Sequence, residues 1–447
     1  MTVADPPSQR AADAFRRLLE QDPSGSRQEL EEIRQRMRRD NLLVGDDVVP
    51  LCFGPALVSD SRLAPIRTET SRLMRILIHL EPILHRPRWM ELLGISPQER
   101  DLIRLPASLP PGSHVSRVDG FLGAPSADDS GFRVVELNID SPGGAAYLDA
   151  SWDMLSATET WKKFKKLHPG RYLRCDRPIL DVLLRSWRRW GGSGSPRVAI
   201  VDWITVSTVS EFNVLRDRFK RAGVDTVVSD PRELEFRNGR LLDYDGRPID
   251  LVYRRVLVED LLARGEEAQA LLDAYRHGAI CMVNPFRAKP LTIKSLLALF
   301  HRPEIEELVD ADDVQFLRRI VPWTAIVEDG PVLEPLRRRR EHLVLKPADG
   351  WGGQGIFLGW ELSESDWDRA LEQAVRGRYV AQERVFIPQA DCPVAVDGGW
   401  KYLPFRLDFD PYFFSRRMGT PLMRLSSNDM LNVKTGGQVA VTWVLKG

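Results

Sequence analysis

The stretch from His342 to Gly355, HLVLKPADGWGGQG, decides how the rest of the chain is interpreted. Its first residues are apolar and predict a short strand that ends at Lys346. Four glycines follow within six positions: Gly350, Gly352, Gly353 and Gly355. Glycine loses the most backbone freedom on folding, so a loop keeps several of them where it needs positive φ or close backbone contact. Backbone N–H groups beside a lysine ammonium suit a polyphosphate.

This loop differs from the Walker phosphate loop, because the lysine precedes the glycines and no Gly-Lys-Ser/Thr follows. A flexible hairpin turn with an incidental lysine remains the alternative interpretation. The choice between the two depends on what the rest of the chain supplies.

The composition is that of an ordinary globular protein. The 447 residues are enough for two or three domains, and 43% of them are apolar and 28% charged. The 63 Lys and Arg residues balance the 63 Asp and Glu residues, so no overall field favours nucleic acid or an anionic membrane. The four cysteines and seven histidines lack metal-ligand spacing, which argues against zinc.

No targeting or membrane segment is expected. The N-terminal sequence MTVADPPSQRAADAF lacks the apolar core of a signal peptide, and no stretch approaches 18 uncharged apolar residues. We therefore expect a cytoplasmic protein with reduced thiols and no membrane partner.

The first 190 residues predict a mainly helical region with one notable strand, Phe132–Leu137. Strand alternation places Glu136, Asn138 and Asp140 on one face, and Ser141 follows before a Pro-Gly-Gly turn. Two carboxylates and an amide on one edge suit either a substrate ammonium or a metal ion. An edge strand with a solvated face is the alternative.

A linker-like stretch, GGSGSP, separates this region from a strand–helix–strand pattern that predicts a small parallel α/β domain. The strand Asp250–Val256 of that domain contains Arg254 and Arg255 near its end. Paired arginines are costly to bury without an anion, which favours carboxylate binding. A salt bridge to Glu259 or Asp260 is the alternative.

The last third of the chain adds further polar positions. Lys294 stands at the start of a helix, where a positive charge is unfavourable unless it binds an anion such as phosphate. The strand Arg378–Val385 presents Glu383, whose carboxylate suits ribose hydroxyls. Asp408 and Asn432 lie on successive strands, and their oxygens suit Mg²⁺. Two hairpin strands with polar outer faces are the alternative to that metal site.

The order of these motifs resembles the ATP-grasp fold of carboxylate–amine ligases, in which two α+β subdomains clamp ATP. The segments SRVDGF, VVELNIDSPGG, DLVYRRV and VNPFRAKPLTIKSLLAL look like those of the circularly permuted ATP-grasp group, relatives of glutathionylspermidine synthase. The resemblance runs from about Arg117 to the C-terminus. It implies an α+β (α/β) fold with an N-terminal helical and substrate-binding region (1–190), a central α/β domain (191–290) and an ATP-grasp nucleotide-binding domain (291–447).

The resemblance also implies a role for each site residue, with ATP and Mg²⁺ as cofactors. Lys294 and Lys346 would bind the phosphates under the lid of Gly352, Gly353 and Gly355. Gln382 and Glu383 would hold adenine and ribose, Asp408 and Asn432 would hold Mg²⁺, and Arg424 would meet the transferred phosphoryl group. The substrates would contact Arg117, Glu136, Asn138, Asp140 and Ser141, and the donor carboxylate would meet Arg254 and Arg255.

The sequence departs from the family at Met430, where many ATP-grasp enzymes carry a metal-binding glutamate. We therefore expect an ATP-dependent ligase that joins amino-acid-like or peptide substrates through an acyl phosphate. A nucleotide-binding regulatory protein without turnover, or a small-molecule phosphotransferase, is the alternative. No nucleic acid partner is expected, and the family leaves a homodimer open.

Overall fold

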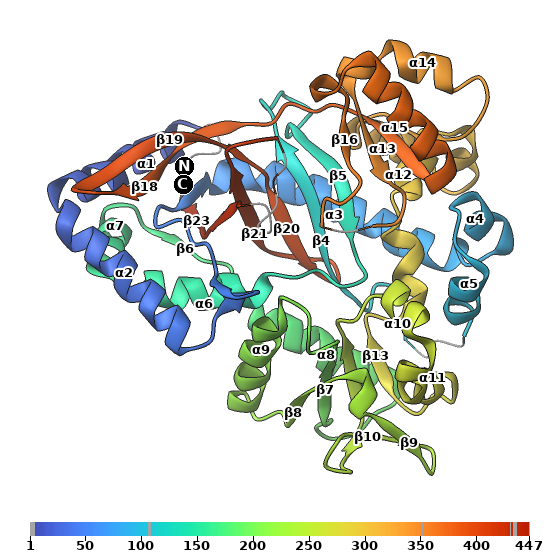
Figure 1. Cartoon of the computed structure of the whole chain (residues 1–447). Coiled ribbons are helices and arrows are strands. Elements are labelled where there is room, and N and C mark those ends of the chain that lie inside the picture. Colours follow the sequence, from blue (N-terminus) through green and yellow to red (C-terminus); the bar gives the residue numbers. More distant parts are fainter. Residues whose placement is uncertain (1–4, 106–108, 351, 430, 432–435, 447) are drawn as a thin grey trace.

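The computed structural model describes residues 5–105, 109–350, 352–429, 431 and 436–446 (Figure 1). Helices and three principal sheets build this part of the chain. The mixed architecture confirms the predicted α+β fold class.

A four-stranded parallel sheet occupies the middle of the chain, in the order β13–β12–β7–β8. Its strands are β7 (Val198–Val201), β8 (Thr226–Ser229), β12 (Leu251–Arg254) and β13 (Cys281–Val283). Nearby along the chain are α8 (Asp176–Trp190), α9 (Val209–Arg221), α10 (Val258–Arg264) and α11 (Gln269–Arg276). Three of the four strands are buried along their whole length, as expected for a parallel sheet covered on both faces. The strand pairing confirms the predicted parallel domain.

A four-stranded antiparallel sheet lies in the last third of the chain, in the order β14–β17–β15–β16. Its strands are β14 (Thr324–Val327), β15 (Leu343–Pro347), β16 (Phe357–Leu358) and β17 (Tyr379–Glu383). The helix α15 (Glu364–Gly377) packs on it, and α14 (Leu333–Arg338) packs against α15. Their shared core contains Leu345, Trp367 and Ala381, so the strand that carries Lys346 is fixed from behind by apolar packing.

A seven-stranded antiparallel sheet forms the centre of the molecule, in the order β18–β19–β21–β20–β4–β5, with β22 paired to β21. Its strands are β4 (Val115–Leu122), β5 (Phe132–Asn138), β18 (Gln389–Val396), β19 (Gly399–Leu407), β20 (Asp410–Phe414), β21 (Arg417–Ser426) and β22 (Gln438–Ala440). The main apolar core joins this sheet to α3 (Asp60–Ile83), α12 (Ser295–Leu299) and α13 (Ala311–Ile320).

The remaining helices lie mostly in the first part of the chain. They are α1 (Pro6–Gln21), α2 (Pro23–Arg39), α4 (Pro87–Leu92), α5 (Pro97–Ile103), α6 (Ala145–Leu155) and α7 (Glu159–Leu167). Short strands complete three small sheets: β1 (Leu43–Val44) with β2 (Asp47–Val48), β9 (Glu235–Arg237) with β10 (Arg240–Leu242) and β11 (Pro248–Ile249), and β3 (Ala56–Ser59) with β23 (Thr442–Leu445) and β6 (Gly170–Arg171).

The central sheet combines strands from distant parts of the chain. β4 pairs with β20, so that Arg117 lies opposite Tyr412, and β3 runs parallel to β23. The N-terminal and C-terminal ends of the chain are also seen next to each other in Figure 1. The predicted domain boundaries at residues 190 and 290 divide the chain into three consecutive segments. The central sheet, in contrast, takes strands from both the first and the last of these segments. Sequence order alone gave no sign of that pairing.

Among the described residues, no helix is both long enough and apolar enough to span a membrane.

Candidate active site

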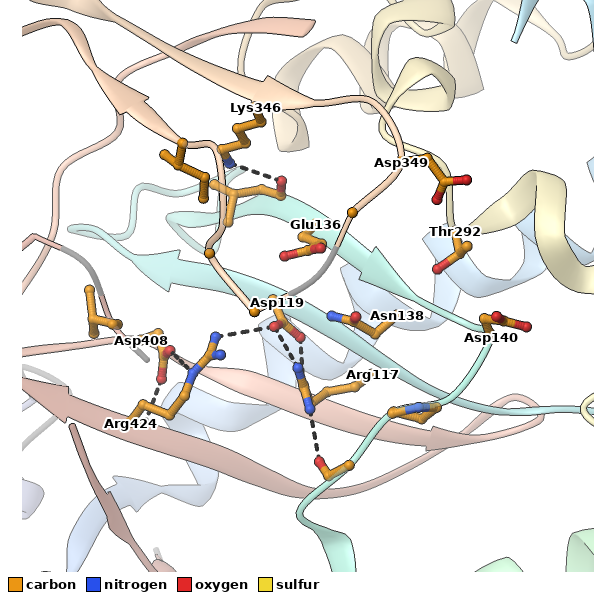
Figure 2. A pocket seen from close by; sticks show the side chains of 18 of the residues that line it. Arg117, Asp119, Glu136, Asn138, Asp140, Thr292, Lys346, Asp349, Asp408 and Arg424 are labelled. Atoms are coloured by element: carbon orange, nitrogen blue, oxygen red, sulfur yellow. Dashed lines mark hydrogen bonds and ion pairs between the residues drawn. The ribbon is translucent and has the colours of Figure 1, made fainter. Parts of the chain in front are cut away.

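The three principal sheets meet at a cleft of about 690 Å³. Side chains of β4 and β5 line one side of it, and Lys346 with the glycine-rich loop lines another. Residues that follow β7 and β12 line its far end. Figure 2 shows polar groups from these separate elements turned toward one space.

Lys346 reaches into this cleft from the end of β15. Its Nζ donates to Oε1 of Gln382 at 2.7 Å and to the carbonyl of Val135 at 3.3 Å. Gln382 is itself fixed, because its amide nitrogen donates to Thr324 Oγ1 at 3.1 Å. Desolvation lowers the pKa of Lys346 to about 8, with Glu136 opposing the shift and Lys294 adding to it. The negative charge near the Lys346 ammonium is therefore too small to offset its burial, as expected for a lysine that binds a phosphate.

Lys294 holds the beginning of the glycine-rich loop. Its Nζ lies 2.8 Å from the carbonyl oxygen of Gly350 and 2.8 Å from a carboxylate oxygen of Glu136. Its backbone N–H donates to the carbonyl of Ala348 at 2.8 Å. The residue immediately precedes α12, as the sequence predicted, but it does not line the cleft itself.

Asp119 joins this group from the neighbouring strand. In the β4–β5 register Asp119 lies opposite Glu136, and Arg117 lies opposite Asn138. Burial raises the pKa of Asp119, but Arg117, Arg424 and Asn138 outweigh it, so the net shift is downward and the carboxylate stays ionised. Asp119 also acts on the pKa of Lys346, which places both in one electrostatic neighbourhood.

Arg424, on β21, binds three buried carboxylates. Its Nε lies 2.5 Å from Asp408, and its terminal nitrogen lies 2.7 Å from Asp410 and 3.1 Å from Asp119. The backbone N–H of Arg424 also donates to Asp408 at 2.6 Å. Arg117 donates to both oxygens of Asp119, at 2.6 and 2.8 Å. Two guanidinium groups thus face three carboxyl groups, and burial raises the pKa of Asp408 and, much further, that of Asp410.

The glycine-rich loop adopts the backbone conformation predicted for it. Gly352, Gly353 and Gly355 have φ of +73°, +76° and +70°, a region that side chains with Cβ rarely occupy. Gly350, Gly352 and Gly353 line the cleft beside Lys346, whereas Gly355 lies outside the lining.

The end of the cleft beyond Gln382 is suited to a flat apolar ring. Val344, Leu358 and Ile387 line it, and Glu383 lies at its rim with its carboxylate 2.6 Å from Arg339. A backbone segment with an adjacent carboxylate is what adenine and ribose require.

Arg255 lines the far end of the cleft, whereas Arg254 does not. Arg254 is fully buried, donates to the carbonyls of Asn284 and Val256 at 3.0 and 2.7 Å, and forms an ion pair with Asp140. The predicted substrate contact of Arg254 is therefore withdrawn, because its donors are occupied inside the protein. The alternative pairing partners, Glu259 and Asp260, are not its partners either.

The cleft otherwise gathers most of the residues predicted from the sequence. Those that line it are Arg117, Glu136, Asn138, Asp140, Ser141, Arg255, Lys346, Gly352, Gly353, Gln382, Glu383, Asp408 and Arg424. Asn432 and Met430 lie outside the described residues.

The sequence interpretation missed Asp119. The signal was present, because Arg117 and Asp119 are charged positions on one face of a strand that is otherwise mostly apolar. A buried strand keeps such charges only with partners, and here the partners are each other and Arg424.

A divalent cation fits Asp119, Glu136 and Asn138 better than it fits Asp408. The first three offer two carboxylates and an amide from facing strands beside Lys346, a hard oxygen set that Mg²⁺ prefers. The two oxygens of Asp408 accept the side chain and the backbone N–H of Arg424, and the backbone donor cannot rotate away. Asp408 thus orients Arg424. Of the two ligands considered for Glu136 and Asn138, a substrate ammonium and a metal ion, the geometry favours the metal ion.

Comparison with known proteins gives relatives in sequence and in structure. No family model matches the chain. Uncharacterized proteins of Mycobacterium tuberculosis and Mycobacterium bovis are 26% identical over 340 residues, which cover 70% of this chain. The matched region covers 58% of those proteins, less than two thirds of their length.

Among solved structures, a glutathione synthetase-like effector from Globodera pallida superposes with a TM-score of 0.62 and 11% identity, over 93% of this chain and 96% of that one. A putative gamma-glutamylcysteine synthetase from Methylobacillus flagellatus reaches a TM-score of 0.41 and 13% identity, over 80% and 83% of the two chains. The sequence resemblance and the superposition agree, and the chain has the ATP-grasp fold of glutathione synthetase-like proteins.

Proposed function

We propose that this protein is an ATP-dependent carboxylate–amine ligase. The observation that carries the proposal is the meeting, in one cleft, of the glycine-rich loop, Lys346 and the oxygen donors Asp119, Glu136 and Asn138. These groups come from two different sheets, as a site that encloses a nucleotide between subdomains requires.

ATP would lie with its triphosphate between the loop and β5. Lys346 supplies positive charge, the N–H groups of Gly352 and Gly353 supply donors, and Lys294 fixes the loop through the carbonyl of Gly350. The base would lie in the apolar end beside Val344 and Leu358, with Glu383 at the ribose.

Asp119, Glu136 and Asn138 would hold Mg²⁺, which neutralises phosphate charge when bound. In the first chemical step the substrate carboxylate attacks the γ-phosphorus, the bond to the β-phosphate oxygen breaks, and an acyl phosphate and ADP result. This transfer depends on positioning and on charge stabilisation rather than on a protein nucleophile. Arg424 and Arg117 line the cleft and would stabilise the charge of the transferred group.

In the second step an amine displaces phosphate from the acyl carbon and forms the amide. The acyl phosphate would hydrolyse in water, so the glycine-rich loop has to cover it. A carboxylate donor would meet Arg255 at the far end of the cleft. Amino-acid or short-peptide substrates, a cytoplasmic location and a homodimer stay predictions from the sequence.

The test is incubation of the purified protein with ATP, Mg²⁺ and pooled amino acids and dipeptides, followed by measurement of ADP, phosphate and new amides by mass spectrometry. Release of ADP and phosphate with an equal amount of a new amide would support the ligase. Tight ATP binding without ADP release for any acid–amine pair would favour a regulatory nucleotide-binding protein. A stable phosphorylated product without amide would favour a phosphotransferase.

The regulatory alternative is less well supported by the structure than by the sequence. It was suggested by the absence of a carboxylate at Met430, whereas Asp119 and Glu136 supply two carboxylates from β4 and β5. These two carboxylates would offer the metal its oxygen donors without a carboxylate at position 430.

A further inference from the structure

The far end of the cleft contains a carboxylate that the proposed ATP site does not use. Asp202 follows β7 directly, at the carboxyl end of the parallel sheet, where ligands of such sheets bind. Its exposed fraction is 8%, yet it lines the same cleft as Lys346 and Glu136. A carboxylate so deeply buried is normally paired with a cation.

Asp202 has no such partner in the described part of the chain. Its Oδ1 accepts the backbone N–H of Trp203 at 2.8 Å, and none of the described lysines, arginines or histidines forms a salt bridge with it. The guanidinium that acts most strongly on Asp202, that of Arg255, forms no salt bridge with it and donates to the carbonyl of Pro142 at 2.7 Å and to the hydroxyl of Tyr253 at 3.3 Å. Asp202 therefore has room for a cation from outside the protein.

The groups around Asp202 favour a cationic ligand over a second anion. Burial raises the pKa of Asp202 to about 7, Asp260 of α10 raises it further, and Arg255 and Arg254 lower it. Asp260 and Glu259 line the same end of the cleft. The other cation there, Lys289, lies 2.8 Å from Asp349 and also pairs with Glu259. Its charge is already balanced.

The ligase reaction needs a group of this kind. An alkylamine is an ammonium ion at neutral pH, and its nitrogen attacks a carbonyl only after it loses a proton. We propose that Asp202 binds the ammonium group of the amine substrate and accepts a proton from it. This inference rests on the ligase function proposed above and assigns the amine to the end of the cleft away from Lys346.

The attack of the amine involves two proton transfers. The ammonium transfers one proton to the carboxylate of Asp202, and the neutral nitrogen forms a bond to the acyl carbon. The bond from that carbon to the phosphate oxygen breaks, and the departing phosphate takes the second nitrogen proton. Asp202 then returns its proton to solvent, so the products are the amide, hydrogen phosphate and one released proton.

Hydroxylamine separates this role from a merely structural one. It is largely uncharged at neutral pH, so it attacks an acyl phosphate without a base and yields a hydroxamate. The experiment uses the full chain with ATP, Mg²⁺ and the acid found in the pooled assay, and compares the natural amine with hydroxylamine. The variants are Asp202→Asn and, as a control, Asp225→Asn, which removes an exposed carboxylate just before β8 at the opposite end of the same sheet.

We expect Asp202→Asn to lower amide formation at about pH 7 by roughly 10²-fold, a typical contribution of a general base. Hydroxamate formation should stay close to that of the wild type, and the amide defect should shrink as the pH rises and free amine accumulates. Asp225→Asn should behave as the wild type in both assays. For the wild type alone, the amide rate should level off above about pH 7, whereas without a base it would keep rising with the fraction of free amine. This readout does not depend on any variant folding.

Equal loss of amide and hydroxamate in Asp202→Asn, or loss of neither, would overturn the role of Asp202 and leave the ligase intact. A wild-type amide rate that keeps rising above about pH 7 in proportion to the free amine would overturn it too. Failure of the wild type to form ADP with any acid would instead refute the ligase on which the inference rests.

Discussion

At the residue scale, the charge of Lys346 gives the most direct test of the proposed phosphate site. Replacement by methionine keeps the length of the side chain and removes its ammonium, so a phosphate would lose a charged hydrogen bond of about 1.5–3 kcal/mol. We expect Lys346→Met to weaken ATP binding accordingly in isothermal titration calorimetry. Lys401→Met on β19 is the control, because that lysine is exposed and lies outside the cleft lining. Unchanged affinity in Lys346→Met would remove Lys346 from the phosphate site.

The same residue predicts a pH dependence. Its pKa is lowered from 10.5 to about 8 by desolvation, so the free protein loses this positive charge as the pH rises through about 8. An anionic phosphate should bind the protonated form, so the affinity for ATP is expected to be full below that pH and to fall above it. Calorimetric titrations between neutral and alkaline pH should show this decline for the wild type. A decline of equal size in Lys346→Met would assign the effect to another group.

Glu136 and Asp408 allow the two possible metal sites to be distinguished. If Glu136 is a ligand, Glu136→Gln should raise the Mg²⁺ concentration needed for half-maximal turnover by at least about tenfold. Replacing even a residue that only supports a metal ligand typically lowers metal affinity by about that factor. Asp408→Asn should lower turnover by releasing Arg424 and leave that concentration nearly unchanged. The measurement is ADP formation across a Mg²⁺ titration. The reverse pattern would restore Asp408 as the ligand.

At the element scale, the glycine-rich loop offers a matched pair of substitutions. Gly352 and Gly355 both have positive φ, so alanine at either position costs about 1–2 kcal/mol of local strain. A Cβ at Gly352 would meet nothing within 4 Å, whereas one at Gly355 would lie 2.8 Å from the hydroxyl of Tyr379. We expect Gly355→Ala to lower the melting temperature more than Gly352→Ala in calorimetric scans. An equal effect would mean that the loop shifts away from Tyr379 without cost.

Local patterns predicted the elements well where composition and periodicity agreed. The strand before Lys346, the helix around Trp367 and the parallel strands of the central domain follow from apolar runs and turn residues. The sequence did not reveal that β4 pairs with β20, because nothing in a strand of eight residues specifies a partner so far along the chain. The contact of Asp408 with Arg424 could not be predicted for the same reason, because it depends on the register of β19, β20 and β21.

At the scale of the whole molecule, the Arg254–Asp140 pair links the parallel domain to the end of β5. Both residues are almost fully buried, so Arg254→Met would leave the charge of Asp140 without its partner, which typically costs 3–5 kcal/mol. We expect a correspondingly lower unfolding midpoint in urea. Arg376→Met is the control, because it breaks only an exposed pair with Glu372 on α15, worth about 0–1 kcal/mol. Equal midpoints for the two variants would show that the buried pair adds nothing to stability.

The pairing of β4 with β20 has a consequence for biosynthesis. During translation β4 and β5 are synthesised long before β20 and β21. The edge of β4, in the hairpin that carries Asp119 and Glu136, therefore stays unpaired until β20 is made. The cleft is therefore one of the last features to form as the chain emerges. A nascent chain arrested before Asp410 would hold both halves of its oxygen donor set and still lack the strand that aligns them.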